Sequence, residues 1–303
     1  MADPTLRQLE FLVAVADSGG MTAAATRCHV SQSTVSLAIA ELERVLEVRL
    51  VIRGSGRRSD LTDAGRQVAA EARAVLAAVA DLGATARGLG GDLAGTLGVG
   101  CYAPLAALHL PSLIAGFRER HPEVHVEYVE GTLLELQRGL QQGTCELALL
   151  YRQDLLPGIA AEVLYDRQPS VLLPANHRLA GNRTVPMREL AQEPFILLDV
   201  ARSARYFAAV FEALGLTMTV AHRASSFDLT RALVARGLGW SLSVQRQPLE
   251  LSVEGLPLAI RPVREEVPTT PVVLAHAEGG RLTRRAEAFA AFCRELFGSG
   301  DAQ

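Results

Sequence analysis

Lysine is absent from the sequence, and all 30 basic residues are arginines. The formal net charge of −3 nevertheless excludes a protein that holds nucleic acid through bulk positive charge. No apolar run approaches the ~18 residues of a membrane span. The first residues lack the basic start and apolar core of a signal peptide. We therefore expect a cytoplasmic protein that does not enter a membrane.

Motifs that carry catalysis or bind metals are missing as well. The four cysteines are far apart, without a CxxC or Cys/His cluster, which excludes a zinc site or disulfide framework of familiar spacing. The sequence has no GxSxG, P-loop, helix-opening GxGxxG or HExxH motif, and its seven histidines are scattered. We expect no catalytic residue, no metal and no cofactor, and therefore no enzyme.

A helix-turn-helix over residues 21–36 is the most informative pattern that is present. Thr22 is expected to cap a short alanine-rich helix, and Ser31 to cap the next one. Short polar groups at the start of that third helix suit contact with phosphates and base edges. The alternative is an ordinary capped helix that faces solvent. The residues expected at DNA are Thr22, Ser31, Gln32, Ser33, Thr34 and Ser36.

An arginine-rich hairpin is expected directly after these helices. Two short extended runs flank a Gly-Ser-Gly turn at residues 54–56, which is typical of a wing. Arg53, Arg57 and Arg58 are expected to grip backbone phosphates beside the groove. The alternative, a solvated arginine cluster, would be favoured if the hairpin did not follow a helix-turn-helix.

A long helix is predicted from residue 62 to about residue 89. Its apolar residues step by four and three along the chain, which is a heptad seam. The seam consists of Val68, Ala72, Val75, Val79, Leu82, Ala86 and Leu89. Such regularity favours a partner helix, and hence a dimer, over packing against the chain's own body. Glycines between residues 88 and 95 then indicate a linker.

From residue 96 onward, strand and helix signals alternate. The order strand-helix-strand-helix-strand between residues 96 and 151 predicts a mostly parallel sheet. The expected strands are 96–101, 124–130, 147–151, 170–174, 195–199, 219–223, 240–244 and 272–277. The expected helices are 104–121, 133–142, 204–214, 228–236 and 283–297.

Several helix starts in this α/β body follow strand ends, where open sheets bind ligands. Helix N-termini carry free N–H groups and suit anions, so we expect a small carboxylate there. The alternative for each position is a plain capping residue or a surface arginine. The residues expected at the ligand are Cys101, Tyr102, Ala103, Thr132, Ser203, Arg205 and Phe227.

The sequence resembles the LysR-type transcriptional regulators over nearly its whole length. The resemblance is carried by Leu6-Arg7-Gln8-Leu9-Glu10-Phe11, Ala24-Ala25, Val30-Ser31-Gln32, Leu42-Glu43 and Leu61-Thr62-Asp63-Ala64-Gly65, and in the body by residues 95–100, 117–122 and 233–239. Two positions depart from the family's common pattern, Ser33 where many members have proline and Val51 where many have phenylalanine.

The resemblance implies an architecture and a set of partners. It implies a winged helix-turn-helix over residues 1–61, a dimerising linker helix over 62–91, and an effector domain over 92–303. That domain would have two periplasmic-binding-protein-like lobes, lobe I at about 95–166 and 270–298 and lobe II at about 167–269. It further implies a homodimer or homotetramer on inverted-repeat operator DNA, contact with RNA polymerase, and control by a small-molecule effector.

Two rival functions remain open from the sequence. A redox-sensing regulator would use Cys101 or Cys145 instead of a bound effector. A cytoplasmic solute-binding protein would share the two lobes but has no need of the N-terminal module. The identity of the effector, the target genes and the direction of regulation do not follow from the residues.

Overall fold

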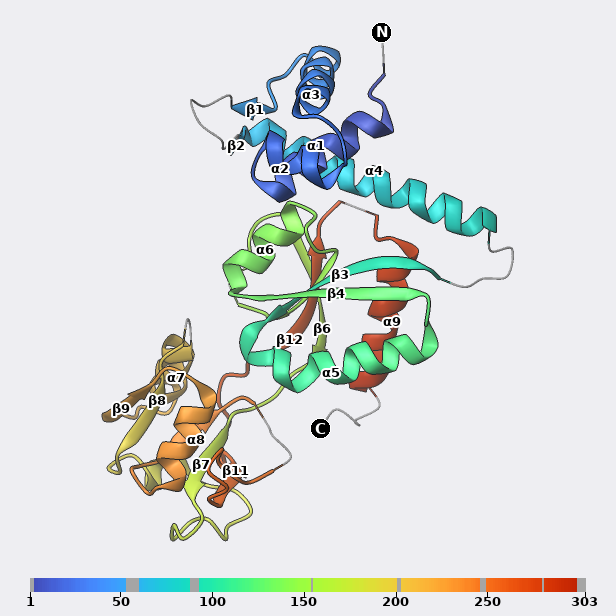
Figure 1. Ribbon diagram of the computed structural model, residues 1–303. Coiled ribbons are helices and arrows are strands. Elements are labelled where there is room, and N and C mark those ends of the chain that lie inside the picture. The colour runs from blue at the N-terminus through green and yellow to red at the C-terminus, as the bar shows by residue number, and fades with distance from the viewer. Residues whose placement is uncertain are drawn as a thin grey trace.

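The structure is a computed structural model that describes residues 3–52, 60–87, 93–153, 155–200, 203–245, 249–279 and 281–298. The chain forms a helix-turn-helix unit, a long helix and two α/β lobes, and its last strand and helix return to the first lobe (Figure 1). The fold is therefore an N-terminal winged helix-turn-helix joined to a two-lobed α/β domain, as the sequence predicts.

The N-terminal unit begins with three helices and ends with a short hairpin. These elements are α1 (Leu6–Ser18), α2 (Met21–Arg27), α3 (Gln32–Leu46), β1 (Val51–Ile52) and β2 (Asp60–Leu61). Thr5 forms a capping box with Gln8 at the start of α1, and Gly19 ends the helix at φ 70°. The predicted core face of α3 is confirmed, because Val35 and Ile39 are buried against α1 and α2.

Helix α4 (Asp63–Arg87) passes between this unit and lobe I (Figure 1). Its first part packs on the N-terminal unit, where Ala69 and Ala72 are buried. A Cβ at Gly65 would lie 2.0 Å from the Leu50 carbonyl oxygen, so only glycine allows this close approach. Farther along, Val75 and Leu82 are exposed. The predicted heptad seam is therefore divided between an internal contact and an open face.

Lobe I is built on a five-stranded sheet in the order β4-β3-β5-β12-β6. Its strands are β3 (Gly95–Tyr102), β4 (Val124–Gly131), β5 (Leu147–Tyr151), β6 (Ile159–Tyr165) and β12 (Val272–Ala277). Its helices are α5 (Ala103–Arg120), α6 (Leu133–Gln141) and α9 (Arg284–Gly298). Rings of Phe117, Phe289 and Phe292 join α5 to α9. Strands β4, β3 and β5 are parallel as predicted, but β12 is antiparallel to both neighbours because it returns from lobe II.

Lobe II holds a three-stranded antiparallel sheet, β10-β7-β11, and a parallel pair, β8-β9. Its strands are β7 (Ser170–Pro174), β8 (Phe195–Leu198), β9 (Val220–Ala224), β10 (Ser241–Ser243) and β11 (Leu258–Pro262). Its helices are α7 (Ser203–Ala213), α8 (Phe227–Ala235) and a 3-10 turn at Met187–Glu189. A bridge between Phe195 and the buried Trp240 connects the two sheets. The two sheets of lobe II therefore share one hydrophobic core that contains Trp240.

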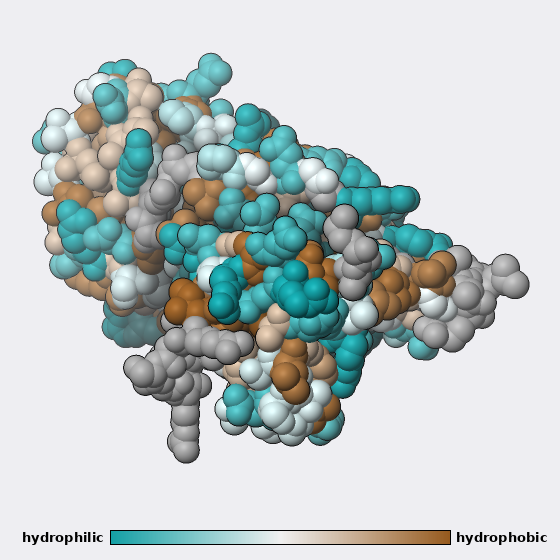
Figure 2. Space-filling view, turned by 90° about the horizontal axis from the view of Figure 1, so that it is seen from above, coloured by the Kyte–Doolittle hydropathy of each residue, from teal (hydrophilic) through white to brown (hydrophobic). Residues whose placement is uncertain are grey.

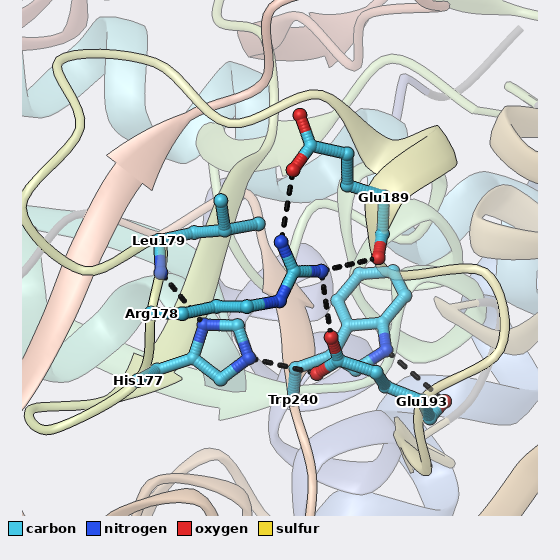
Figure 3. A network of polar contacts seen from close by, with 6 residues as sticks. All are labelled: His177, Arg178, Leu179, Glu189, Glu193 and Trp240. Carbon is cyan, nitrogen blue, oxygen red and sulfur yellow. Dashed lines mark hydrogen bonds and ion pairs between the residues drawn. The ribbon is translucent and has the colours of Figure 1, made fainter.

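A charged network closes the long loop between β7 and β8 (Figure 3). Arg178 donates to the Glu189 carboxylate at 2.9 Å and to Glu193 at 2.9 Å. His177 shares a 2.7 Å hydrogen bond with Glu193, whose carbonyl accepts from the Trp240 indole at 3.3 Å. Because these charges satisfy one another, we interpret the network as structural rather than as a ligand site.

Candidate DNA interface and effector cleft

The start of α3 is organised around the Ser31 hydroxyl. This oxygen accepts from the Thr34 N–H at 3.2 Å and lies 2.7 Å and 2.8 Å from the hydroxyls of Ser33 and Thr34. Gln32 is exposed and Ser36 half-exposed, and neither side chain has a hydrogen-bond partner within the described residues. Of the predicted contact residues, Gln32 and Ser36 therefore have their polar groups available for DNA.

Thr22 occupies a different place from the one predicted. The residue before α2 is Gly20, and no side chain caps this helix. Thr22 lies inside the first turn of α2, is exposed, and its carbonyl accepts from the Thr26 hydroxyl at 3.1 Å. The expected cap is wrong because Gly20 is the residue at the cap and the helix begins two residues earlier than predicted, at Met21.

The hairpin is tied to α3 by a buried carboxylate that the sequence did not single out for a role. Glu43 Oε1 accepts from the N–H groups of Leu50 at 2.8 Å and Val51 at 3.1 Å. Arg49 approaches the same carboxylate at 3.4 Å. The predicted wing residues Arg53, Arg57 and Arg58 lie outside the described residues. The signal for Glu43 was an acid among the inward positions of an amphipathic helix.

Arg73, in the middle of α4, joins three parts of the chain. Its guanidinium donates to the carboxylate of Asp17 in α1 and to the carbonyl of Gln142 after α6. Asp17 also pairs with Arg27 at 3.1 Å. One side chain thus connects the N-terminal unit to lobe I.

A cavity of about 50 Å³ lies between the lobes, at the carboxyl ends of β3, β5 and β8. Both lobes contribute to its wall, which consists of Tyr102, Pro104, Leu133, Tyr151, Gln153, Leu198, Val200, Ser203, Tyr206, Phe207, Phe227, Ser243, Val244, Gln245 and Thr270. The lining is mostly apolar, with hydroxyl and amide groups and no charged side chain among the described residues. Such a cleft suits a small molecule held by shape and a few hydrogen bonds.

Three of the predicted ligand residues line this cavity, namely Tyr102, Ser203 and Phe227. Cys101 points into the core of lobe I and is fully buried. The exposed residues Ala103 and Arg205 do not line the cavity.

Thr132 is also outside the cavity wall, and Leu133 takes that place. The Thr132 N–H and hydroxyl donate to the Glu135 carboxylate at 2.9 Å and 2.8 Å. The hydrogen bond from this N–H, followed by that from the hydroxyl, lowers the pKa of Glu135. A negative charge therefore already occupies the α6 N-terminus, which disfavours an anionic ligand there.

The polar groups of the cleft are mostly engaged in the protein. The Ser203 hydroxyl lies 2.6 Å from the Leu198 carbonyl oxygen, and the Tyr206 hydroxyl donates to the Pro268 carbonyl at 2.8 Å. Gln245 of lobe II donates to the Pro104 carbonyl of lobe I and so bridges the cleft. Burial raises the pKa of Tyr206, so this phenol stays neutral.

Cys101 and Cys145, the two cysteines considered for a redox role, lie in the core of lobe I. Cys101 and Cys145 are buried, and burial raises the pKa of each thiol to about 12. The nucleophile towards peroxide is the thiolate, which is scarce at neutral pH for such groups. Within the described residues there is no cluster of metal-ligating side chains. No described helix is long and apolar enough to cross a membrane.

A helix-turn-helix unit with an exposed polar edge on α3 is joined to two lobes that enclose a neutral cleft. This combination is that of a ligand-responsive DNA-binding regulator. Residues 6–66 match the family described as bacterial regulatory helix-turn-helix protein, lysR family, and residues 90–298 match the LysR substrate binding domain. The chain belongs to the LysR family of DNA-binding transcriptional regulators.

Relatives of established family cover much of the chain. A probable hydrogen peroxide-inducible genes activator of Mycobacterium xenopi is 39% identical, over 60% of this chain and 96% of the relative. Another from Mycobacterium avium is 35% identical, over 84% of this chain and 83% of the relative. The crystal structure of PA01 protein, a putative LysR family regulator from Pseudomonas aeruginosa, is similar at 35% identity and a TM-score of 0.66, covering 98% and 100% of the two chains.

Proposed function

We propose that this regulator binds its operator through α3 and the wing, and that a small molecule between the lobes controls this binding. The observation that carries the proposal is the cavity lined from both lobes. Its ~50 Å³ is about a third of the ~150 Å³ that holds benzene in an engineered cavity. An effector must therefore part the lobes and break the bridge from Gln245 to Pro104.

We infer that the effector is a compact, mostly apolar molecule with neutral hydrogen-bonding groups. A carboxylate, as expected from the sequence, would meet no cation among the described lining residues, and burying an unpaired charge is costly. Arg202 and Arg246, which are neighbours in sequence of the lining residues Ser203 and Gln245, lie outside the described residues.

The chain is proposed to work as a dimer or a pair of dimers on an inverted repeat. Hydrophobic side chains gather along α4 where it extends to the right of the molecule (Figure 2). Val75, Val79 and Leu82 are 44%, 41% and 69% exposed on this helix, which suits a second copy of α4. The proposed domains are the DNA-binding domain at residues 1–61, the linker helix at 62–91 and the effector domain at 92–303. We further propose contact with RNA polymerase at the promoter, and action in the cytoplasm, where the DNA is.

The relatives named for peroxide induction raise a second candidate, a redox sensor. The buried, high-pKa thiols of Cys101 and Cys145 oppose that use of these residues. Mass spectrometry after mild peroxide separates the two functions. Oxidation of either thiol in the folded chain, together with altered operator binding, would favour the redox sensor over the ligand sensor.

The ligand class is tested by thermal shift with matched pairs of aromatic carboxylates and their amides. A ligand at about 100 times its dissociation constant adds about 2.7 kcal/mol of stability. We expect amides to stabilise the protein more than the acids, and Phe227→Ala to remove the effect. Stabilisation by the acids alone would instead mean that the effector is a carboxylate. Stabilisation that persists in Phe227→Ala would place the ligand elsewhere.

A further inference from the structure

We propose that Leu37 is a specificity-determining residue that covers the C5-methyl group of a thymine in the operator. The proposal rests on the placement of α3 in the major groove. Leu37 is 72% exposed although it lies in the middle of a well-formed helix. The fold covers little of this large apolar side chain, so its surface is available to a partner outside the N-terminal unit.

The geometry of α3 directs Leu37 away from its own core. Val35, Ile39 and Leu42 are buried and define the inward face. At 3.6 residues per turn, residue 37 falls almost opposite the centre of these three. In a helix-turn-helix, the face of the second helix that points away from the core is the face presented to the groove.

The neighbours of Leu37 on this face leave it uncovered. Ser33 and Ala40, one turn to either side, are small, and the Ser33 hydroxyl is engaged with Ser31 at 2.7 Å. Glu41, also one turn on, is occupied by an ion pair with Arg44 at 2.6 Å. The apolar side chain of Leu37 therefore protrudes from the helix surface without being covered by its neighbours.

The chemical groups in the major groove indicate which one the Leu37 side chain would contact. Base edges in the major groove offer hydrogen-bond donors and acceptors, which leucine cannot use, and one apolar group, the thymine methyl. Removing one buried methyl-sized contact weakens binding about fourfold. Leu37 should therefore favour thymine at one position in each half-site and act independently of the effector cleft.

The test uses the full-length chain and an operator obtained by selection from random duplex DNA. Each thymine of the operator is replaced in turn by deoxyuridine, which lacks only the C5-methyl group. Affinities are measured by fluorescence anisotropy for the wild type, for Leu37→Ala and for Leu249→Ala. Leu249 is a matched control because it is a 65% exposed leucine in lobe II. Alanine keeps the helix propensity of α3, so Leu37→Ala is expected to fold, as circular dichroism will verify.

For the wild type and Leu249→Ala, we expect one deoxyuridine position per half-site to weaken binding about fourfold. In Leu37→Ala that position should become insensitive, while every other position behaves as in the wild type. The inference is overturned if the wild type selects a defined operator but Leu37→Ala keeps the same deoxyuridine profile. A wild type that selects no sequence at all would instead overturn the placement of α3, and with it this assignment.

Discussion

Replacing Glu43 should release the wing from the recognition helix. The Glu43 carboxylate is 8% exposed and accepts from the N–H groups of Leu50 and Val51, which are themselves buried. In Glu43→Ala both N–H groups lose their partner, and each buried unsatisfied donor costs about 1–3 kcal/mol. The change therefore removes about 2–6 kcal/mol from the local stability of the hairpin. That is a large share of the 5–15 kcal/mol typical of a whole protein.

Hydrogen exchange of the Leu50 and Val51 amides measures this directly. A loss of 2 kcal/mol accelerates exchange by about thirtyfold, since each 1.4 kcal/mol is tenfold. Glu43→Gln keeps an acceptor oxygen and should retain most of the protection, because only the charge assistance is lost. The affinity for the operator should fall slightly in Glu43→Gln and further in Glu43→Ala.

Glu41→Ala is the matched control on the same helix. Glu41 is an exposed acid paired with Arg44 across one turn, and its removal should leave the exchange of both amides near the wild-type value. Wild-type exchange at Leu50 and Val51 in Glu43→Ala would refute the anchoring role. So would equal acceleration in Glu41→Ala, because it would make the effect one of general helix destabilisation.

Three further outcomes are expected. Aspartate at both Val75 and Val79 should abolish dimers in analytical ultracentrifugation, because like charges would be buried against each other; an unchanged mass would mean that other interfaces dominate. Cys101 and Cys145 should resist iodoacetamide at pH 7 until the chain is unfolded, since burial holds each thiol pKa at about 12; labelling of the native chain would contradict this. Burial, aided by Arg167, lowers the pKa of His109 from 6.5 to about 4. The unfolded chain therefore takes up a proton first as pH falls, and about 3 kcal/mol of stability should be lost between pH 6.5 and 4. Urea titrations should show a flatter pH profile in His109→Gln, and equal profiles would exclude this contribution.

Local signals explain why much of the fold was predictable from the sequence. The Ser31 cap, the inward face of α3 and the Gly19 helix end each depend on residues within one or two turns, and the structure confirms all three. Strand β6 (Ile159–Tyr165) was missed because its residues do not alternate between apolar and polar. Its pairing with β12 joins segments more than a hundred residues apart, which no local pattern encodes.

The candidate sites were less predictable because they depend on which partner a residue finds. The predicted long helix is present, yet Ala72 is buried within the chain while Val79 is exposed, so the heptad spacing alone does not say which contact a residue makes. Thr132 has the sequence of a helix cap beside a cleft, but Glu135 occupies that cap. Strand ends indicated the region of the cavity, whereas its neutral lining depends on the meeting of two lobes.

The Arg73 contacts couple the orientation of lobe I to that of the N-terminal unit through the middle of α4. The helix has 25 residues and is therefore about 37 Å long. Arg73 is the eleventh residue of this helix, so a rotation of about 5° at that point would move its N-terminal end by about 1.3 Å. Because Arg73 donates to Asp17 of the N-terminal unit and to Gln142 of lobe I, a tilt of lobe I would be passed directly to the N-terminal unit.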